Sequence, residues 1–277
     1  MSVLNFLEID NYITSKGYKS NIKLSYQTFG RPINSAPVVL VNHALTGNSN
    51  VAGDNGWWKD LIGENKVIDT NTYSVISFNI PGNGYDGFVI NNYKDFEAGD
   101  IASIFLKALK LLKINKLFAI IGGSLGGGIA WEMAVLQPSI TEHLIPVATD
   151  WKSTDWLIAN CQIQEQFLLN SNNPVHDARM HAMLCYRTPE SFKKRFQRSK
   201  NEELEIFNVE SWLLHHGNKL QERFQLSAYK LMNQLLKTID ATKHSEDKFD
   251  VLDTIEAKIH IIGVDSDMFF TEEKNRE

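Results

Sequence analysis

The sequence predicts an α/β protein in which helices cross over a mostly parallel sheet and a helical insertion interrupts the later part. Between residues 38 and 147, short apolar runs rich in Val and Ile alternate with longer helical periods, which is typical of a parallel sheet with crossover helices. From 151 to 254 the pattern is helical with almost no strand signal. A chain of 277 residues can bury one large core, so a single domain with an insertion is expected.

The elements can be assigned in order along the chain. Two extended segments closed by glycine turns, at 5–14 and 22–28, predict an antiparallel start to the sheet. Parallel strands are expected at 38–42, 73–79, 116–121, 143–148 and 258–264, with an amphipathic helix at 95–112. Helical periodicity in the insertion covers 155–169, 176–186, 189–198 and 209–236. We therefore expect a core from 1–150 and 255–277, with 151–254 as a helical cap that walls a pocket at the carboxyl ends of the strands.

The segment 122–126 (GGSLG) is the most informative motif, because it lies between an expected strand and a helical pattern at 125–137. It fits the G-x-S-x-G nucleophile elbow, in which a sharp strand-to-helix turn lifts a serine hydroxyl to the top of a parallel sheet. Small residues are needed where the new helix passes close to neighbouring strands, which accounts for the glycines at 126–128. Ser124 is therefore the candidate nucleophile.

A glycine-rich loop between a strand and a helix also suits phosphate or dinucleotide binding. A P-loop requires G-x-x-x-x-G-K-[ST], and no lysine follows these glycines. A dinucleotide fingerprint requires G-x-G-x-x-G, whereas Trp131 stands where the third glycine would be. A tight turn whose serine has no catalytic role is the remaining alternative.

A serine hydroxyl is a weak nucleophile at neutral pH, so Ser124 needs a histidine base and an acid that orients the histidine. In this architecture the chain order is serine, acid, histidine. Asp267 is the preferred acid, because it comes just past the late strand. Asp265 is the neighbouring alternative, and either aspartate could simply turn the chain.

No histidine follows Asp267 in this sequence. We therefore expect the catalytic histidine beyond residue 277, and little activity from the 277-residue chain alone. Among the upstream histidines, His215 and His216 fall in the cap and His260 falls within a strand pattern, so other roles are expected for them. His43 precedes the elbow, and we expect it to brace its own loop.

The oxyanion hole of such a site needs two backbone N–H groups. Leu125 follows the nucleophile and supplies the first. The second is expected from Leu45, in the loop 43–47 that follows the strand at 38–42.

Composition excludes several classes of function. The net charge is −5, without a basic block, so no nucleic-acid partner is expected. No apolar run approaches the roughly 18 residues of a membrane span and no signal peptide is recognised, so we expect a cytoplasmic protein without a membrane partner. Cys161 and Cys185 have no CxxC partners, so packed, reduced thiols are expected rather than a disulfide or a metal site. No cluster of metal ligands has the required spacing on one element.

Taken together, several segments resemble homoserine O-acetyltransferase, an acyltransferase family with the α/β-hydrolase fold. In the core these are 42–47 (NHALTG), 56–63 (GWWKDLIG), 122–127 (GGSLGG) and the acid-bearing 266–270 (SDMFF). In the cap they are 178–179 (AR), 185–188 (CYRT), 195–196 (RF) and 207–212 (FNVESW). The matches span about residues 42 to 270.

The resemblance implies a two-step transfer, in which Ser124 takes an acetyl group from acetyl-CoA and passes it to the side-chain hydroxyl of L-homoserine in methionine biosynthesis. It also implies that Asp267 is the orienting acid and that Arg179 and Tyr186 hold the amino acid. An arginine fork suits a substrate carboxylate, although a surface ion pair is the alternative for Arg179. Acetyl-CoA would be consumed as a co-substrate, so no tightly held cofactor is implied.

Two departures from the family pattern affect the substrate. Residues 79–87 read NIPGNGYDG, where the family usually has a Leu-Gly start and a Gly-Ser-Thr-Gly-Pro segment, and Asn48 stands where several members have aspartate. Another hydroxyl acceptor, such as serine, or another acyl chain is therefore an alternative, and the sequence does not decide between acetyl and succinyl donors.

Two alternative functions are compatible with the same residues. A serine esterase or thioesterase would use the same triad with water as the acceptor, and a catalytically dead binding protein would keep only the fold.

The cap helices carry more apolar residues than one sheet edge covers, which favours a homodimer through the cap, as the family resemblance also implies. Alternatively, these helices bury their apolar faces on one another.

Overall fold

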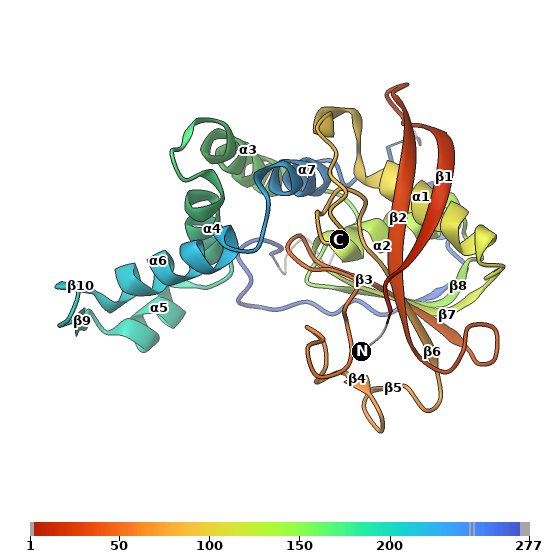
Figure 1. Cartoon of the computed structure of the whole chain (residues 1–277), viewed down its shortest axis with the longest axis horizontal. Coiled ribbons are helices and arrows are strands. Elements are labelled where there is room, and N and C mark those ends of the chain that lie inside the picture. The colour runs from red at the N-terminus through yellow and green to blue at the C-terminus, as the bar shows by residue number, and fades with distance from the viewer. Residues whose placement is uncertain (1–2, 244, 246, 272–277) are drawn as a thin grey trace.

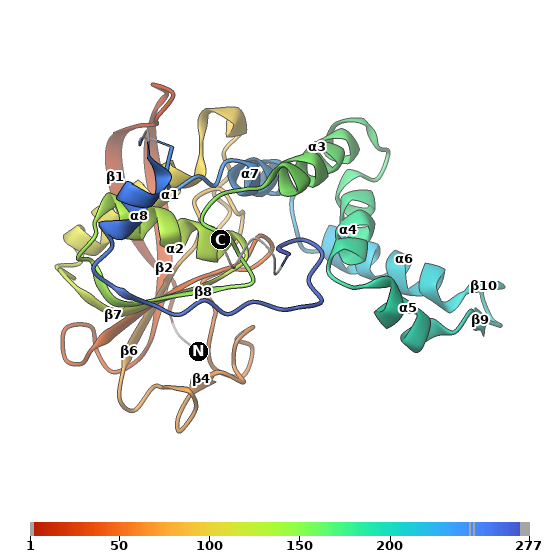
Figure 2. The same ribbon diagram turned by 180° about the vertical axis from the view of Figure 1, so that it is seen from behind.

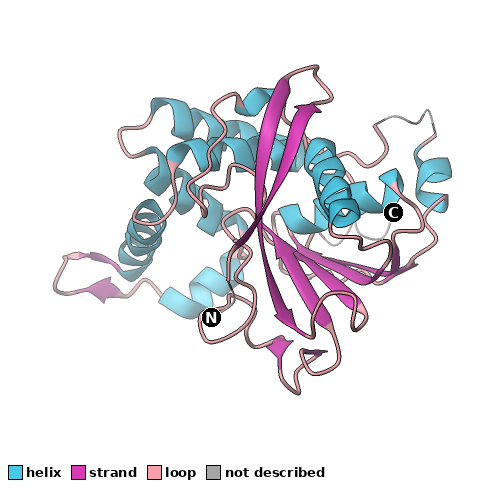
Figure 3. Ribbon diagram, turned by 45° about the vertical axis from the view of Figure 1, so that its right-hand side comes forward, coloured by secondary structure: helices cyan, strands magenta, loops and turns pink. Residues whose placement is uncertain are grey.

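The computed structural model describes residues 3–243, 245 and 247–271, and its centre is a seven-stranded sheet. The strand order is β1-β2-β6-β3-β7-β8-β11. β1 (Asn5–Ile13) and β2 (Lys19–Gly30) form a long antiparallel hairpin, and β2 also pairs antiparallel with β6 (Ser74–Phe78). This confirms the predicted antiparallel start of the sheet (Figure 3).

The remaining strands run parallel, which confirms the predicted α/β class. They are β3 (Val38–Asn42), β7 (Leu117–Gly123), β8 (Thr141–Val147) and β11 (Lys258–Ile259). Every residue of β3 and of β6 is buried, as expected for strands covered on both faces.

The late strand is shorter than the predicted 258–264, for a reason that lies in β8. After β11, the His260 N–H donates to the Leu144 carbonyl (2.8 Å) and the Ile262 N–H donates to the Pro146 carbonyl (3.0 Å). The intervening rung would require an N–H from Pro146, which proline lacks. The ladder therefore reduces to an isolated bridge between Val147 and Ile262.

Two helices pack against each other and against one face of the sheet. α1 (Ala98–Leu111) begins at a capping box, in which the Glu97 N–H donates to the Asp100 carboxylate at 2.9 Å. α2 (Leu125–Leu136) directly follows β7, and ten of its residues are buried. The opposite face is covered over β3, β6 and β7 by the loop 48–72, which carries the short strands β4 (Ile62–Gly63) and β5 (Ile68–Asp69).

Within residues 151–254, most helices lie to one side of the sheet (Figure 1). These helices are α3 (Asp155–Asn170), α4 (Pro174–Cys185), α5 (Pro189–Phe196), α6 (Asn208–Gln221) and α7 (Leu226–Lys237). The short strands β9 (Lys200–Asn201) and β10 (Ile206–Phe207) form a hairpin that joins α5 to α6. α8 (Lys248–Asp253) instead lies beside α1 and α2, where Leu252 packs against the main core (Figure 2).

One helical pattern is corrected by the structure. The continuous periodicity at 209–236 divides into α6 and α7, which are separated at 222–225. Phe224 in this break is 7% exposed and packs edge-on against the Tyr229 ring, with the ring centroids 6.0 Å apart. Burial of Phe224 in the core therefore favours a turn at this point, which the helical period alone does not reveal.

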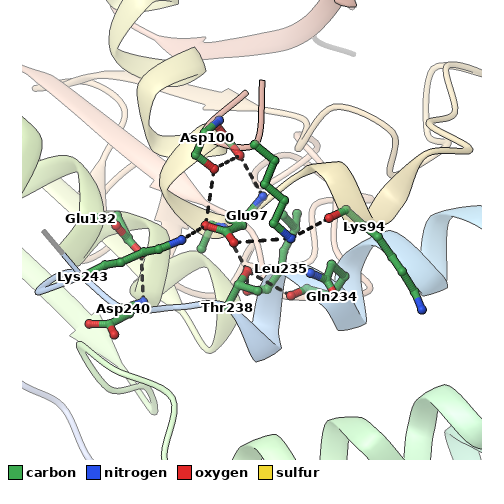
Figure 4. A network of polar contacts seen from close by, with 12 residues as sticks. Lys94, Glu97, Asp100, Glu132, Gln234, Leu235, Thr238, Asp240 and Lys243 are labelled. Carbon is green, nitrogen blue, oxygen red and sulfur yellow. Dashed lines mark hydrogen bonds and ion pairs between the residues drawn. The ribbon is translucent and has the colours of Figure 1, made fainter. Parts of the chain in front are cut away.

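A polar network ties α7 and the segment after it to α1 and α2 (Figure 4). Thr238 Oγ1 accepts a hydrogen bond from the first backbone N–H of α1 at 3.1 Å. The Glu132 carboxylate, on α2, accepts from the Asp240 N–H at 2.9 Å, and Lys243 pairs with the Glu97 carboxylate. The segment that follows α7 is thereby fixed to α1 and α2.

The described part of the chain contains both cysteines of the sequence. Both cysteines are free and buried, as predicted, and burial raises the pKa of the Cys161 thiol to about 12. In this part of the chain no group of His, Cys, Asp and Glu could hold a metal ion. No helix there has the length and apolar character that a bilayer crossing requires.

Candidate active site

Ser124 occupies a strained turn between β7 and α2. Its φ is +52° and its ψ is −123°, a conformation that L-residues rarely adopt and that costs about 1–3 kcal/mol. The Ser124 N–H donates to the Val147 carbonyl at 2.9 Å, and the Ser124 carbonyl accepts from the Gly127 and Gly128 N–H groups. The geometry is that of a nucleophile elbow, with the serine half-buried at the carboxyl end of the sheet.

The glycines after Ser124 are required by close backbone approach. A Cβ at Gly126 would lie 2.4 Å from the Asn42 carbonyl oxygen, which belongs to the neighbouring strand β3. The Asn42 side chain also donates from Nδ2 to the Gly126 carbonyl at 3.2 Å. The N-terminus of α2 is therefore held directly against the carboxyl end of β3.

This contact brings the two predicted oxyanion donors to the same edge of the sheet. Leu125 is the first residue of α2, where a backbone N–H has no acceptor within the helix. Leu45 lies in the turn that follows β3, and in the described part of the chain no acceptor is found for its N–H. The roles of both N–H groups as oxyanion donors stay predictions.

His43 has the bracing position that the sequence predicted. It is fully buried, and its Nε2 accepts a hydrogen bond from the Ile80 N–H at 2.9 Å. Its Nδ1 lies 2.8 Å from the Ala44 carbonyl oxygen, so the proton is on Nδ1. Burial lowers the pKa of His43 to about 4, which keeps the ring neutral.

Asp267 lies on the loop after β11, and the first part of this loop contacts the same end of β8 that holds Ser124. The Val147 carbonyl accepts from the Ser124 N–H, and the adjacent Ala148 N–H donates to the Ile262 carbonyl at 2.8 Å. Oδ1 of Asp267 accepts from the N–H groups of Phe269 (2.7 Å) and Phe270 (3.3 Å). Burial raises the pKa of Asp267 in spite of these bonds. Asp265 is exposed.

Arg179, on α4, and Tyr186, at its end, lie together near Asp267. The Arg179 guanidinium is 5.6 Å from the centroid of the Tyr186 ring, and the Tyr186 ring contacts that of Phe269 with centroids 5.8 Å apart. Although 44% of Tyr186 is exposed, burial of its hydroxyl end raises its pKa, and the Asp267 charge adds to this rise. The predicted acid and the two predicted substrate-binding residues thus share one region between the cap and the sheet.

None of the described histidines is found in contact with Ser124 or Asp267. His143 and His260 pair with each other at 3.0 Å, at strands β8 and β11. His176 pairs with Asp177, His181 with Gln164, and His215 and His216 contact each other. His244 lies outside the described residues, as do the positions where the base is expected.

One contact at the site was missed by the sequence analysis. Arg223 Nη1 donates to the Thr46 carbonyl at 3.2 Å, across 177 positions of sequence. The contact joins the turn between α6 and α7 to the loop of Leu45. A single arginine at a helix break gives no sequence signal for such a partner.

Comparisons with known proteins bear directly on this geometry. A family model described as "alpha/beta hydrolase fold" matches residues 37–196. A homoserine O-acetyltransferase of Chloroherpeton thalassium is 30% identical, over 92% of this chain and 74% of its own length. That of Trichormus variabilis is also 30% identical, over 94% of this chain and 79% of its own. This chain belongs to the homoserine O-acetyltransferase family.

Solved structures agree with membership of the homoserine O-acetyltransferase family and of the α/β-hydrolase fold. The homoserine O-acetyltransferase of Staphylococcus aureus superposes with a TM-score of 0.84 at 25% identity, covering 99% of this chain and 83% of that one. The esterase E22 L374D mutant superposes with a TM-score of 0.87 at 21% identity, covering 100% and 88%, and shows the fold alone. The resemblance and the fold predicted from the sequence are confirmed.

Proposed function

We propose that this protein is an acyltransferase of methionine biosynthesis, which moves an acetyl group from acetyl-CoA to the side-chain hydroxyl of L-homoserine. Family membership supports acyl transfer. The observation that carries the mechanism is the strained elbow at Ser124. Two backbone N–H groups, from Leu45 and Leu125, have no acceptor in the described part of the chain and would supply the oxyanion hole. Both substrates are small molecules, and neither is retained as a cofactor.

In the proposed first step, Ser124 Oγ attacks the thioester carbonyl carbon. The carbonyl oxygen becomes an oxyanion, which the N–H groups of Leu45 and Leu125 stabilise. The C–S bond then breaks, CoA leaves as the protonated thiol, and the acetyl group remains on Ser124. The proton moves through a histidine that Asp267 orients and that lies outside the described residues.

In the second step, the hydroxyl of homoserine attacks the acetyl-serine, and the same histidine takes the hydroxyl proton and returns it to Ser124 Oγ. An amino acid must outcompete water for this intermediate. Arg179 is proposed to hold the substrate carboxylate, because its fork matches two oxygens and no carboxylate in the described residues pairs with it. Tyr186 is proposed to bound the same pocket.

The decisive experiment follows the acetyl group. The protein is incubated with acetyl-CoA, with and without homoserine, and with free imidazole added as a base; thiol release, O-acetylhomoserine and the mass of the Ser124 peptide are measured. We expect an acetylated Ser124, faster thiol release with homoserine, and loss of both in Ser124→Ala. Thiol release at the same rate with and without homoserine would indicate a thioesterase. No added mass on Ser124 would indicate a binding protein and would overturn the proposal.

A homodimer through the cap is also proposed. α5 and β10 border an apolar groove lined by Phe192, Phe196, Phe207 and Val209 on the projecting tip of the cap (Figure 1). A second copy of the chain would cover such a groove. Sedimentation velocity should show a dimer that Phe196→Asp converts to a monomer, and a wild-type monomer at micromolar concentration would refute it.

A further inference from the structure

The predicted oxyanion donor at Leu45 belongs to a peptide whose orientation is fixed by its other end. The Ala44 carbonyl oxygen accepts hydrogen bonds from the Gly47 N–H (2.8 Å) and from His43 Nδ1 (2.8 Å). In a trans peptide the carbonyl and the following N–H point in opposite directions. Holding the Ala44 carbonyl therefore sets the direction of the Leu45 N–H.

The Gly47 N–H that holds Ala44 is in turn part of a peptide that the cap contacts. That peptide comprises the Thr46 carbonyl and the Gly47 N–H, and its carbonyl accepts from Arg223 Nη1 at 3.2 Å. A hydrogen bond from a guanidinium to a carbonyl is charge-assisted and stronger than a neutral one. The peptide is thus held at both ends, by the cap at its oxygen and by Ala44 at its nitrogen.

Arg223 is positioned for this contact by the packing of the cap. The next residue, Phe224, is buried, and α7 begins two residues later, at Leu226. α7 in turn lies tightly on the loop after β6: a Cβ at Gly82 would be 2.6 Å from Leu231 Cδ2. That loop includes Ile80, whose N–H donates to Nε2, the other ring nitrogen of His43. α7 therefore supports both contacts that hold the loop of Leu45, the one from Arg223 to Thr46 and the one from Ile80 to His43.

The electrostatics of Arg223 fit a role as a hydrogen-bond donor rather than as an ion-pair partner. No carboxylate pairs with Arg223 among the residues that the structure describes. Partial burial, together with repulsion from Arg179, lowers the pKa of Arg223. Arg179 and Arg223 are therefore close enough to repel each other, and among the described residues a backbone-carbonyl partner is found for Arg223 but not for Arg179.

We propose that Arg223 is a positioning residue, which fixes the Thr46–Gly47 peptide and through it the direction of the Leu45 N–H. Placement of the cap and the shape of the oxyanion hole are then coupled through one side chain. The structural part of this inference stands on the contacts alone. Its catalytic consequence rests on the proposed function.

Amide hydrogen exchange of the intact chain tests the proposal, with the Gly47 amide and the segment 43–48 as reporters. Arg223→Met keeps the aliphatic stem and removes the donors, and should accelerate exchange at Gly47 by roughly three- to tenfold, the effect of losing one hydrogen bond. Arg223→Lys, which keeps a charged donor, should restore part of the protection. Arg198→Met is the matched control, because the Arg198 guanidinium stacks on Phe207 at the tip of the cap. This substitution should leave the exchange rate of the Gly47 amide unchanged.

Exchange at Gly47 that is equal in Arg223→Met and the wild type would overturn the proposal. So would an equal acceleration in Arg198→Met, since it would indicate general loosening of the cap. These outcomes are independent of acetyl transfer. If Gly47 responds as expected but Ser124 is never acetylated, the positioning role stands and the proposed function fails.

Discussion

His43 Nε2 accepts the backbone N–H of Ile80 at 2.9 Å, and this bond joins the loop after β3 to the loop after β6 inside the protein. The ring is fully buried, and its pKa is lowered to about 4. Because the unfolded chain binds a proton near pH 6.5 and the native ring does not, His43 favours unfolding as the pH falls from about 6.5 to about 4. Above about pH 6.5 the ring is neutral in both states, so protonation of His43 no longer affects the free energy of unfolding.

His43→Ala should therefore be costly at neutral pH and less so in acid. At pH 7 it leaves a cavity and an unpaired Ile80 N–H, which together should lower the free energy of unfolding by about 2–4 kcal/mol. At pH 5 protonation of His43 in the unfolded chain has already lowered the free energy of unfolding of the wild type. The difference in this free energy between the wild type and His43→Ala should therefore be smaller than at pH 7. Urea unfolding at both pH values measures this, and a difference that grows in acid would contradict a neutral ring in the native state.

The strain at Ser124 predicts that two small substitutions differ in stability. Ser124→Gly should raise the melting temperature relative to Ser124→Ala, because glycine adopts the φ of +52° without a Cβ penalty of about 1 kcal/mol or more. Calorimetry of the two variants checks this. Equal melting temperatures would mean that the elbow relaxes when the hydroxyl is removed.

The glycines that follow the nucleophile should differ in their tolerance of a methyl group. Gly126→Ala places Cβ against the backbone carbonyl of Asn42, which is part of the sheet. Gly128→Ala places Cβ 2.3 Å from Cδ1 and 2.7 Å from Cγ1 of Ile239, a buried side chain that can shift more easily than the backbone of a strand. We expect Gly126→Ala to lose soluble, folded protein and Gly128→Ala to lose about 1–3 kcal/mol. The reverse order in denaturant titrations would refute the close contact with β3.

Glu132 predicts a pH dependence of opposite sign to that of His43. Burial raises its pKa to about 7. The hydrogen bond from the Asp240 N–H and the charge of Lys243 oppose this rise, whereas the charges of Asp240 and Glu97 add to it. The native carboxyl therefore holds a proton that the unfolded chain releases near pH 4.5. Its contribution to stability is largest at low pH and declines as the pH rises through about 7.

Glu132→Gln should remove this decline, since the amide oxygen can still accept the Asp240 N–H. At pH 8 the variant should be more stable than the wild type by roughly 1–3 kcal/mol, and near pH 5 the two should be similar. Glu142→Gln, at an exposed glutamate, is the control and should not change the pH profile. A pH-independent difference between Glu132→Gln and the wild type would argue against a protonated Glu132.

Arg179→Lys should affect the amino acid more than the acyl donor. A lysine offers a point charge in place of a planar fork, so homoserine binding should weaken by about tenfold while acetyl-CoA binding is retained. Isothermal titration with each ligand measures the two affinities. An equal loss for both ligands would indicate damage to the cap rather than loss of a carboxylate partner.

The sequence by itself determined the α/β class, the elbow at Ser124 and the family, because these depend on local patterns: apolar period, glycine spacing and motifs of a few residues. It also placed His43 in a bracing role. The tertiary structure decided what depends on residues far apart in the chain. The break before α7 follows from burial of Phe224, and the shortened β11 ladder follows from a proline in the neighbouring strand. The Arg223 contact with Thr46 spans 177 positions, and no local pattern encodes a partner at that distance.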